Sequence, residues 1–312
     1  MDIRHLLLTG LGAVAIGGCM DANAPDAGLA REAAAQAAFE SATQAWRDRR
    51  VERLLAPDGW ASLTGLHWIE PGAHRVGSDT DNGIRLEMGP EHLGLLRNED
   101  GRVVFTPEDP AAVTLDGAPM AGPAPLATDA DDGGPSVVGF DEGRGQATVI
   151  VRNDRLALRV RHADAPTRTG FAGLAYWPGG RDWIVQARFE PHPEGRTIPV
   201  ANIIGAFDEM ANPGVLVFER DGREHRIEAL DEGGDELFLI FADRTSGHGS
   251  YSAGRYLYVP RPGADGLVPV DFNRAYNPPC AFTAFATCPL PPPENRLDLA
   301  ITAGEKAYHH PE

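Results

Sequence analysis

Residues 215–230 read VLVFERDGREHRIEAL, and this stretch decides the fold class. Two strand-like runs flank Asp221-Gly222, a dipeptide typical of the tight turn of a β-hairpin. Short β-branched or alternating segments recur on both sides of this hairpin, from Trp60 to Phe272, and Gly, Pro and Asp turn signals separate them. The sequence therefore predicts a mainly β protein, with a sandwich or barrel-like architecture.

An Ala-rich segment, residues 29–55, precedes the strands and contains neither Gly nor Pro. Its strong helix formers predict one N-terminal α-helix, which Pro57 and Gly59 end. A Gly-, Pro- and Asp-rich stretch at 119–135 indicates a domain boundary. We expect four parts: a signal peptide (1–19), a tether and helix (20–55), a small β subdomain (56–135), and a main β domain (136–312) with a Pro/Cys-rich loop at 271–297.

The N-terminus indicates export. Arg4 is followed by an apolar run at 6–16, which is shorter than the ~20 residues of a membrane-spanning helix. Residues 16–19, Ile-Gly-Gly-Cys, resemble a bacterial lipobox, with Cys19 as the lipidated residue. The alternative is an ordinary cleaved signal peptide with a chance cysteine. We expect a lipid-anchored protein of the cell envelope that faces the periplasm.

The formal net charge is -17, from 45 Asp and Glu against 28 Lys and Arg. A field of this sign repels phosphate backbones, and the basic stretch at 46–55 is interrupted by acids. We therefore expect no nucleic-acid partner. The sequence predicts neither a cofactor nor a metal site, and the partners we expect are a membrane and a small-molecule ligand.

Cys280 and Cys288 are the two cysteines that remain after Cys19. Outside the cytoplasm such a pair favours a disulfide, and the prolines at 278, 279 and 289 stiffen both ends of the loop. Free structural thiols, a nucleophilic cysteine and a metal clip are the alternatives. The metal clip lacks a Cys-x-x-Cys spacing and a nearby histidine.

Two polar segments predict the site: a hairpin at 243–256 and the loop 271–297. A proline-stiffened loop with acids, amides and a guanidinium is suited to hold a small polar or anionic ligand. Asp271 and Glu294 are the candidate acid or base groups of a cofactor-free hydrolase that also uses Arg296. A metal- or thiol-dependent enzyme is a further alternative, and so is a loop whose polar groups only satisfy one another. The predicted ligand-binding residues are Asp243, His248, Tyr251, Arg255, Asn273, Tyr276, Asn277, Asn295 and Arg296.

Residues 74–117 resemble the forkhead-associated sandwich in their order of short strands, from Val76-Gly77 through Ile84, His92 and residues 103–105 to Leu115-Asp116-Gly117. The resemblance implies a shared β-sandwich architecture. Ser78 stands where that family places a phosphate-binding arginine, so we do not expect phosphopeptide binding.

Four stretches together resemble the DUF1684 family: residues 56–79, 166–178, 243–259 and, above all, DFNRAYNPPCAFTAFATCPLPPPENRLDLAITAGEKAY at 271–308. The likeness runs from about Trp46 to Tyr308. The resemblance implies no established activity or substrate. Some members of the family lack export signals, and in a reducing cytosol the cysteine pair would remain thiols or hold a metal.

Overall fold

In the computed structural model the structure describes residues 27–310, so the predicted signal peptide and Cys19 lie outside the described residues. Helix α1 (Ala27–Leu54) confirms the predicted N-terminal helix. Its residues up to Ser41 form one compact unit, and a second unit begins at Ala42. The last turn of α1 buries Leu54 among Ala61, Ala281 and Phe282. No helix within residues 27–310 is both long enough and apolar enough to cross a membrane.

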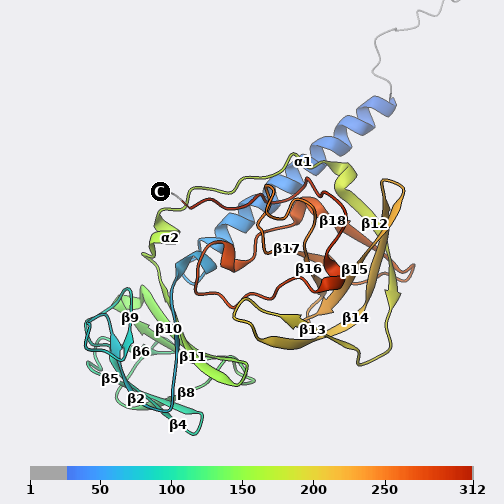
Figure 1. Ribbon diagram of the computed structural model, residues 1–312. Coiled ribbons are helices and arrows are strands. Elements are labelled where there is room, and N and C mark those ends of the chain that lie inside the picture. Colours follow the sequence, from blue (N-terminus) through green and yellow to red (C-terminus); the bar gives the residue numbers. More distant parts are fainter. Residues whose placement is uncertain (1–26, 311–312) are drawn as a thin grey trace, which may run out of the picture. The chain divides into compact units, whose positions relative to one another are not determined.

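The first β region is a sandwich of two sheets (Figure 1). Its strands are β1 (Leu63–Trp68), β2 (Gly72–Gly77), β3 (Ile84–Arg85), β4 (Gly94–Glu99), β5 (Arg102–Pro107), β6 (Thr114–Leu115), β7 (Ala118–Pro119), β8 (Ala124–Leu126), β9 (Val137–Phe140), β10 (Gly145–Arg152) and β11 (Arg155–His162). One sheet has the order β1-β11-β10-β9-β6-β7, and the other has the order β3-β2-β4-β5-β8. Residues from both sheets share one buried core, which runs from Ile69 to Val160. This core continues past residue 135, where the sequence predicts a boundary.

The second β region is a sheet that nearly closes into a barrel. Its strands are β12 (Ile184–Pro191), β13 (Thr197–Ala201), β14 (Phe207–Arg220), β15 (Arg223–Asp231), β16 (Glu236–Phe241), β17 (Arg255–Pro260) and β18 (Leu267–Asp271). The order is β17-β16-β15-β14-β12-β18, with β13 paired to β14, and the two edge strands β17 and β18 approach each other. The mainly β prediction is therefore confirmed.

The hairpin at 215–230 forms as predicted. Strands β14 and β15 pair in antiparallel register from Val215↔Glu228 to Arg220↔Arg223. The two turn residues, Asp221 and Gly222, have φ values of 54° and 70°. Positive φ at both central residues is the geometry that matches the twist of a two-residue hairpin, and Asp and Gly tolerate it well.

Strands β16 and β17 each carry two different faces. Leu237, Leu239 and Leu257 belong to the core inside the barrel-like sheet, whereas Phe238 and Tyr256 belong to a second buried cluster. This division follows from the period of two in a strand, which sends successive side chains to opposite faces. The second face, with its aromatic residues, is the floor of the candidate site.

Short helical turns lie in the loops before, between and after the strands. They are η1 (Trp60–Ser62), η2 (Asp141–Gly143), α2 (Pro166–Thr169), η3 (Arg181–Trp183), η4 (Phe272–Arg274), η5 (Pro279–Ala281) and η6 (Pro293–Asn295). In η5 and η6 proline occupies the first turn, where its missing N–H has no helical partner to lose.

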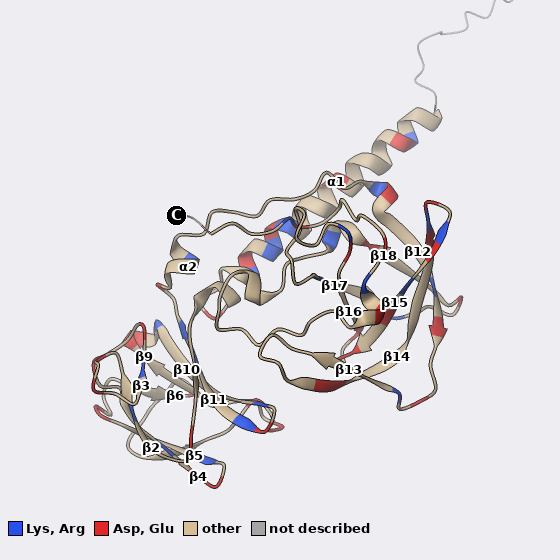
Figure 2. Cartoon of the chain, in the orientation of Figure 1, with Lys and Arg blue, Asp and Glu red and all other residues tan. Residues whose placement is uncertain are grey.

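Acidic and basic residues are interspersed along the C-terminal half of α1, as the red and blue segments in Figure 2 show. This agrees with the interruption of the basic stretch by acids.

Candidate ligand-binding site

A cavity of about 820 Å³ lies on the aromatic face of β16 and β17. Its walls come from the C-terminal half of α1, from the start of β14, from the end of β10, from the middle of β11, and from residues 274–289 of the Pro/Cys-rich loop. Two backbone hydrogen bonds of 2.9 Å between Tyr256 and Tyr276 fasten the loop to β17. On the other side the N–H of Leu290 donates to the carbonyl of Ala201 at 2.7 Å. The loop is therefore held over the sheet at both ends.

Aromatic side chains form one wall of this cavity. The ring of Phe238 meets Tyr256 edge-on, with 4.9 Å between centroids, and stacks on Tyr258 at 4.8 Å. Tyr276 lies edge-on to Tyr256 at 5.8 Å. The Tyr256 hydroxyl donates to the carbonyl of Pro289 at 2.7 Å. These four rings offer a large, preformed surface for a flat or apolar group.

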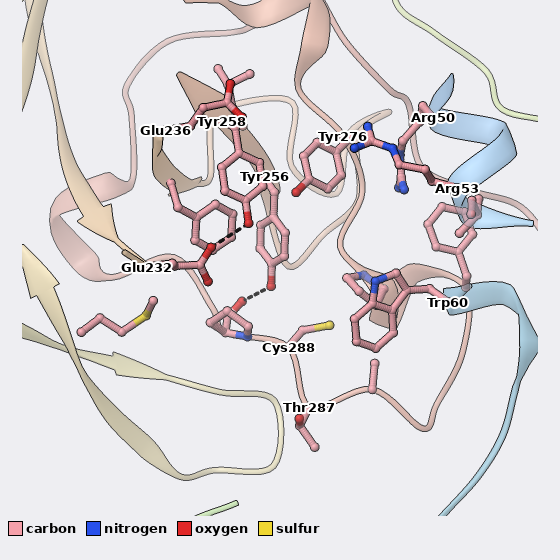
Figure 3. Close-up of a pocket in the computed structure, with 18 of the residues that line it drawn as sticks. Arg50, Arg53, Trp60, Glu232, Glu236, Tyr256, Tyr258, Tyr276, Thr287 and Cys288 are labelled. Atoms are coloured by element: carbon pink, nitrogen blue, oxygen red, sulfur yellow. Dashed lines mark hydrogen bonds between the residues drawn. The ribbon is translucent and has the colours of Figure 1, made fainter. Parts of the chain in front are cut away.

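Charged groups of opposite sign stand at the two ends of the cavity. Figure 3 shows Arg50 and Arg53 on the helix side and Glu232 at the other end. Arg50 is buried: its Nε contacts Glu305 Oε1 at 2.9 Å, and its guanidinium lies 4.7 Å above the Tyr276 ring. Glu232 is exposed and accepts a hydrogen bond from the Tyr258 hydroxyl at 2.7 Å.

Arginines also reach the cavity from β10 and β11. Arg152 pairs with Asp129 at 2.6 Å and donates to the Thr287 hydroxyl at 3.1 Å. Arg159 is buried and has no ion pair within residues 27–310. Its guanidinium lies 5.5 Å from the Trp60 ring, which also lines the cavity.

The two cysteines lie together beside the cavity, as free thiols. The N–H of Cys280 donates to Cys288 Sγ at 3.1 Å, and Cys288 lines the cavity. A hydrogen bond from the Cys288 thiol lowers the pKa of Cys280, whereas that same bond and burial raise the pKa of Cys288. A disulfide between them stays a prediction.

Two of the predicted ligand-binding residues are buried against each other and hold the hairpin at 243–256. Arg255 Nη2 contacts Asp243 Oδ2 at 2.7 Å and donates to the carbonyl of Ile301 at 2.9 Å. Asp243 Oδ1 also accepts from the N–H and hydroxyl of Thr245. This pair is 1% and 0% exposed at its side chains, so it fastens the C-terminal segment and does not line the cavity.

The side chains of the three predicted asparagines are likewise hydrogen-bonded to backbone groups. Asn295 bridges strands β15 and β16, since its Nδ2 donates to the carbonyls of Glu228 and Ile240, each at 2.9 Å. Asn273 exchanges two 2.9 Å hydrogen bonds with the backbone of Gly180. Asn277 donates through Nδ2 to the carbonyl of Lys306 at 2.7 Å. None of the three lines the cavity.

The remaining predicted residues do not converge on one point. Asp271 caps η4 and contacts Arg274 at 3.1 Å. Glu294, Arg296 and His248 are exposed. The Tyr251 hydroxyl donates to the carbonyl of Cys280 at 3.1 Å. Of the predicted catalytic and ligand-binding residues, the structure places only Tyr276 on the cavity wall.

Several cavity residues were not predicted from the sequence. Tyr256 and Tyr258 alternate in the strand segment RYLYV, and this spacing was a signal that they share one face. Arg159 stands in the alternating segment LALRVRH at 156–162, in which the apolar partners face the sandwich core. Trp60 and Arg50 carried no local signal, because their place depends on packing between distant segments.

One surface group in the first β region has metal-ligand chemistry. Ligand atoms of Asp79, Asp81 and His92 lie within 4.8 Å of one another, with Asp79 half-buried and the other two exposed. The N–H of Asp81 and the hydroxyl of Thr80 already donate to Asp79 Oδ1. Exposed acidic clusters of this kind are common on protein surfaces.

The family-model match covers the strands of the second β region. A family model described as "Protein of unknown function (DUF1684)" matches residues 169–306. A solution NMR structure of an uncharacterised protein of Haloarcula marismortui is 33% identical and has a TM-score of 0.38; the match covers 45% of this chain and 78% of that chain. No curated protein matches the chain. Through residues 169–306, which include the loop over the cavity, the chain belongs to the DUF1684 family.

Proposed function

We propose that this protein binds a small organic molecule in the cavity between α1, the aromatic face of β16 and β17, and residues 274–289. The observation that carries the proposal is the cavity itself, which has a volume of about 820 Å³ and is lined by aromatic rings of this sheet and loop. Small-molecule sites typically enclose about 300–1,000 Å³, with mostly apolar walls and a few polar groups that orient the ligand.

The polar groups favour a ligand with an apolar or aromatic body and polar ends. Tyr256, Tyr258 and Tyr276 offer ring faces. Arg53 is exposed at the helix end and has no ion pair within residues 27–310, and Glu232 stands at the opposite end. A hydrolase built on Asp271, Glu294 and Arg296 has no comparable support, because none of the three lines the cavity.

The test fills the cavity with a larger side chain. Met210 on β14 lines the cavity, and Glu209 precedes it on the opposite face of the strand. Met210→Trp is compared with the matched control Glu209→Trp for binding of anilinonaphthalene sulfonate, an aromatic sulfonate, followed by fluorescence. We expect saturable one-to-one binding by the wild type and by Glu209→Trp, and a loss of about tenfold or more in affinity for Met210→Trp. Equal affinity in all three proteins refutes the proposal.

We also propose that the protein is exported and lipid-anchored through Cys19. The support is the order Ile-Gly-Gly-Cys at 16–19 behind a short apolar run. In cells that process bacterial lipoproteins, the wild type should incorporate labelled palmitate and sediment with membranes, and Cys19→Ser should do neither. Incorporation of label into Cys19→Ser contradicts the assignment.

A further inference from the structure

Arg159 is a buried charge on the wall of the cavity. It lies on β11 between Leu158 and Val160, which face the sandwich core, so its side chain leaves the sheet on the opposite face. Only 7% of the residue is exposed, and it lines the cavity. Arginine is almost never this deeply buried without a partner.

No partner satisfies Arg159 in the described part of the chain. Its Nε is buried without a hydrogen bond, and no hydrogen bond or ion pair connects its guanidinium to residues 27–310. The nearby carboxylate, Asp129, is already bound to Arg152 at 2.6 Å and to the N–H of Val151 at 2.8 Å. The Trp60 ring at 5.5 Å is a weak substitute for an anion, because this distance is near the limit of a cation–π contact.

The physical state of this guanidinium follows from its surroundings. Burial, followed by the charges of Arg152 and Arg161, lowers the pKa of Arg159 to about 10. The group therefore stays protonated at neutral pH, with donors in a planar fork and no acceptor for them. A buried charge in this condition destabilises the empty protein, and an anion that enters the cavity removes the cost.

We propose that Arg159 binds an oxyanion, a carboxylate or a phosphate group, of the molecule that occupies the cavity; this inference rests on the proposed function. The planar guanidinium matches both groups through two parallel hydrogen bonds. The Trp60 ring beside it offers a surface for the part of the ligand next to the anion. Arg159 thus gives the cavity a preferred end for negative charge, inside a protein whose net charge is negative.

The neighbouring Arg161 supplies a matched control. It lies two residues along the same strand, and its guanidinium is 5.9 Å from the same Trp60 ring. It does not line the cavity, and the charge of Asp58 partly compensates it. A substitution of Arg161 therefore removes the same charge from the same face without changing a residue that lines the cavity.

The experiment measures the melting temperature of the wild type, Arg159→Met and Arg161→Met in sodium phosphate, sodium benzoate and sodium chloride at equal ionic strength. We expect phosphate or benzoate to raise the melting temperature of the wild type and Arg161→Met above the value in chloride, and the salt that acts identifies the kind of oxyanion. For Arg159→Met the affinity should fall by about tenfold or more. In chloride, Arg159→Met should melt at the same temperature as the wild type or higher, because an uncompensated buried charge is gone. A merely structural arginine would lower the melting temperature instead.

The outcomes separate this inference from the proposed function. If neither salt stabilises the wild type, or if both stabilise Arg159→Met as strongly, Arg159 is not an oxyanion site, although the loss of dye binding in Met210→Trp would still support the cavity as a ligand site. If Met210→Trp binds the dye normally, the proposed function fails whatever Arg159→Met does. Should Arg159→Met not fold, Arg159→Gln takes its place in the same comparison.

Discussion

Arg50 in α1 and Glu305 form a buried ion pair, with 2.9 Å between Nε and Oε1, although 255 residues separate them. Glu305 Oε2 also accepts from the N–H of Asn277 at 2.8 Å, and Arg50 Nη2 donates to the carbonyl of the same residue at 3.0 Å. Three distant segments therefore meet at one charge pair: the helix, the Pro/Cys-rich loop and the C-terminal segment. The helix side of the cavity depends on this junction.

Removal of one partner of the pair should be costly. In Glu305→Gln the Arg50 guanidinium stays buried without a counter-charge, and we expect the free energy of unfolding to fall by about 3–5 kcal/mol. Urea denaturation of Arg50→Met, Glu305→Gln and the double variant gives the coupling between them. Asp164→Asn is the control, since it breaks an exposed pair with Arg144 and should cost less than about 1 kcal/mol. Equal costs for the buried and exposed substitutions would show that the junction is not needed for stability.

Asn295 is buried and its neighbour Glu294 is exposed, so substitutions of the two should differ in their effect on stability. Asn295→Ala leaves the N–H and carbonyl of Glu228 and the carbonyl of Ile240 without their side-chain partner, so we expect a loss of about 1–3 kcal/mol in the free energy of unfolding. Glu294→Ala removes an exposed side chain from the same turn and should change stability by less than about 0.5 kcal/mol. Thermal or urea unfolding measures both. A larger loss of stability for Glu294→Ala than for Asn295→Ala would contradict the structural role of Asn295.

The fold could be predicted from the sequence, whereas the roles of the polar loop residues could not. Strand alternation and the Asp221-Gly222 turn depend on local chemistry, and they predicted the β fold and the hairpin. The loop over the cavity was also visible as a stiff, polar insertion. The roles of its polar residues were not, because a buried Asn295 or Arg255 must satisfy backbone groups that are distant in sequence. Whether a polar side chain faces a ligand or a carbonyl is decided by packing, which no local pattern records.

The arginines that line the cavity could not be predicted from the sequence either. Arg159 and Arg50 come from strands and a helix outside the predicted polar segments, and they reach the cavity only through the fold. A single sequence contains no signal that a guanidinium in such an element is buried without an acceptor.

The cysteine pair should react unequally. Cys280 is half-buried and its pKa is lowered, whereas Cys288 is buried and its pKa is raised. Since the thiolate is the reactive form, iodoacetamide should alkylate Cys280 faster than Cys288 at neutral pH, as peptide mass spectrometry can measure. Cys288→Ala should slow the reaction of Cys280 at this pH, because it removes the hydrogen bond that lowers the pKa of Cys280. Faster alkylation of Cys288 contradicts the assignment.

The tyrosines predict how stability depends on pH. Burial raises the pKa of Tyr256, Tyr258 and Tyr276 in the cavity and of Tyr176 and Tyr251 outside it. In the unfolded chain these groups ionise near pH 10. Above this pH the unfolded state loses protons that the folded state retains, so the free energy of unfolding should fall as the pH rises from about 10 toward the pKa values of the folded state. Below about pH 9 the same groups are neutral in both states and should add no pH dependence.

Tyr256→Phe tests this effect at one residue. The substitution removes a buried hydroxyl and its bond to the Pro289 carbonyl, which should lower the free energy of unfolding by about 1 kcal/mol at neutral pH. It also removes one titrating group, so the decline above about pH 10 should be shallower than in the wild type. Urea denaturation at a series of pH values, with tyrosinate absorbance recorded in parallel, measures both slopes. Identical slopes in the two proteins would mean that Tyr256 ionises alike in the folded and unfolded states, against the burial of its ring.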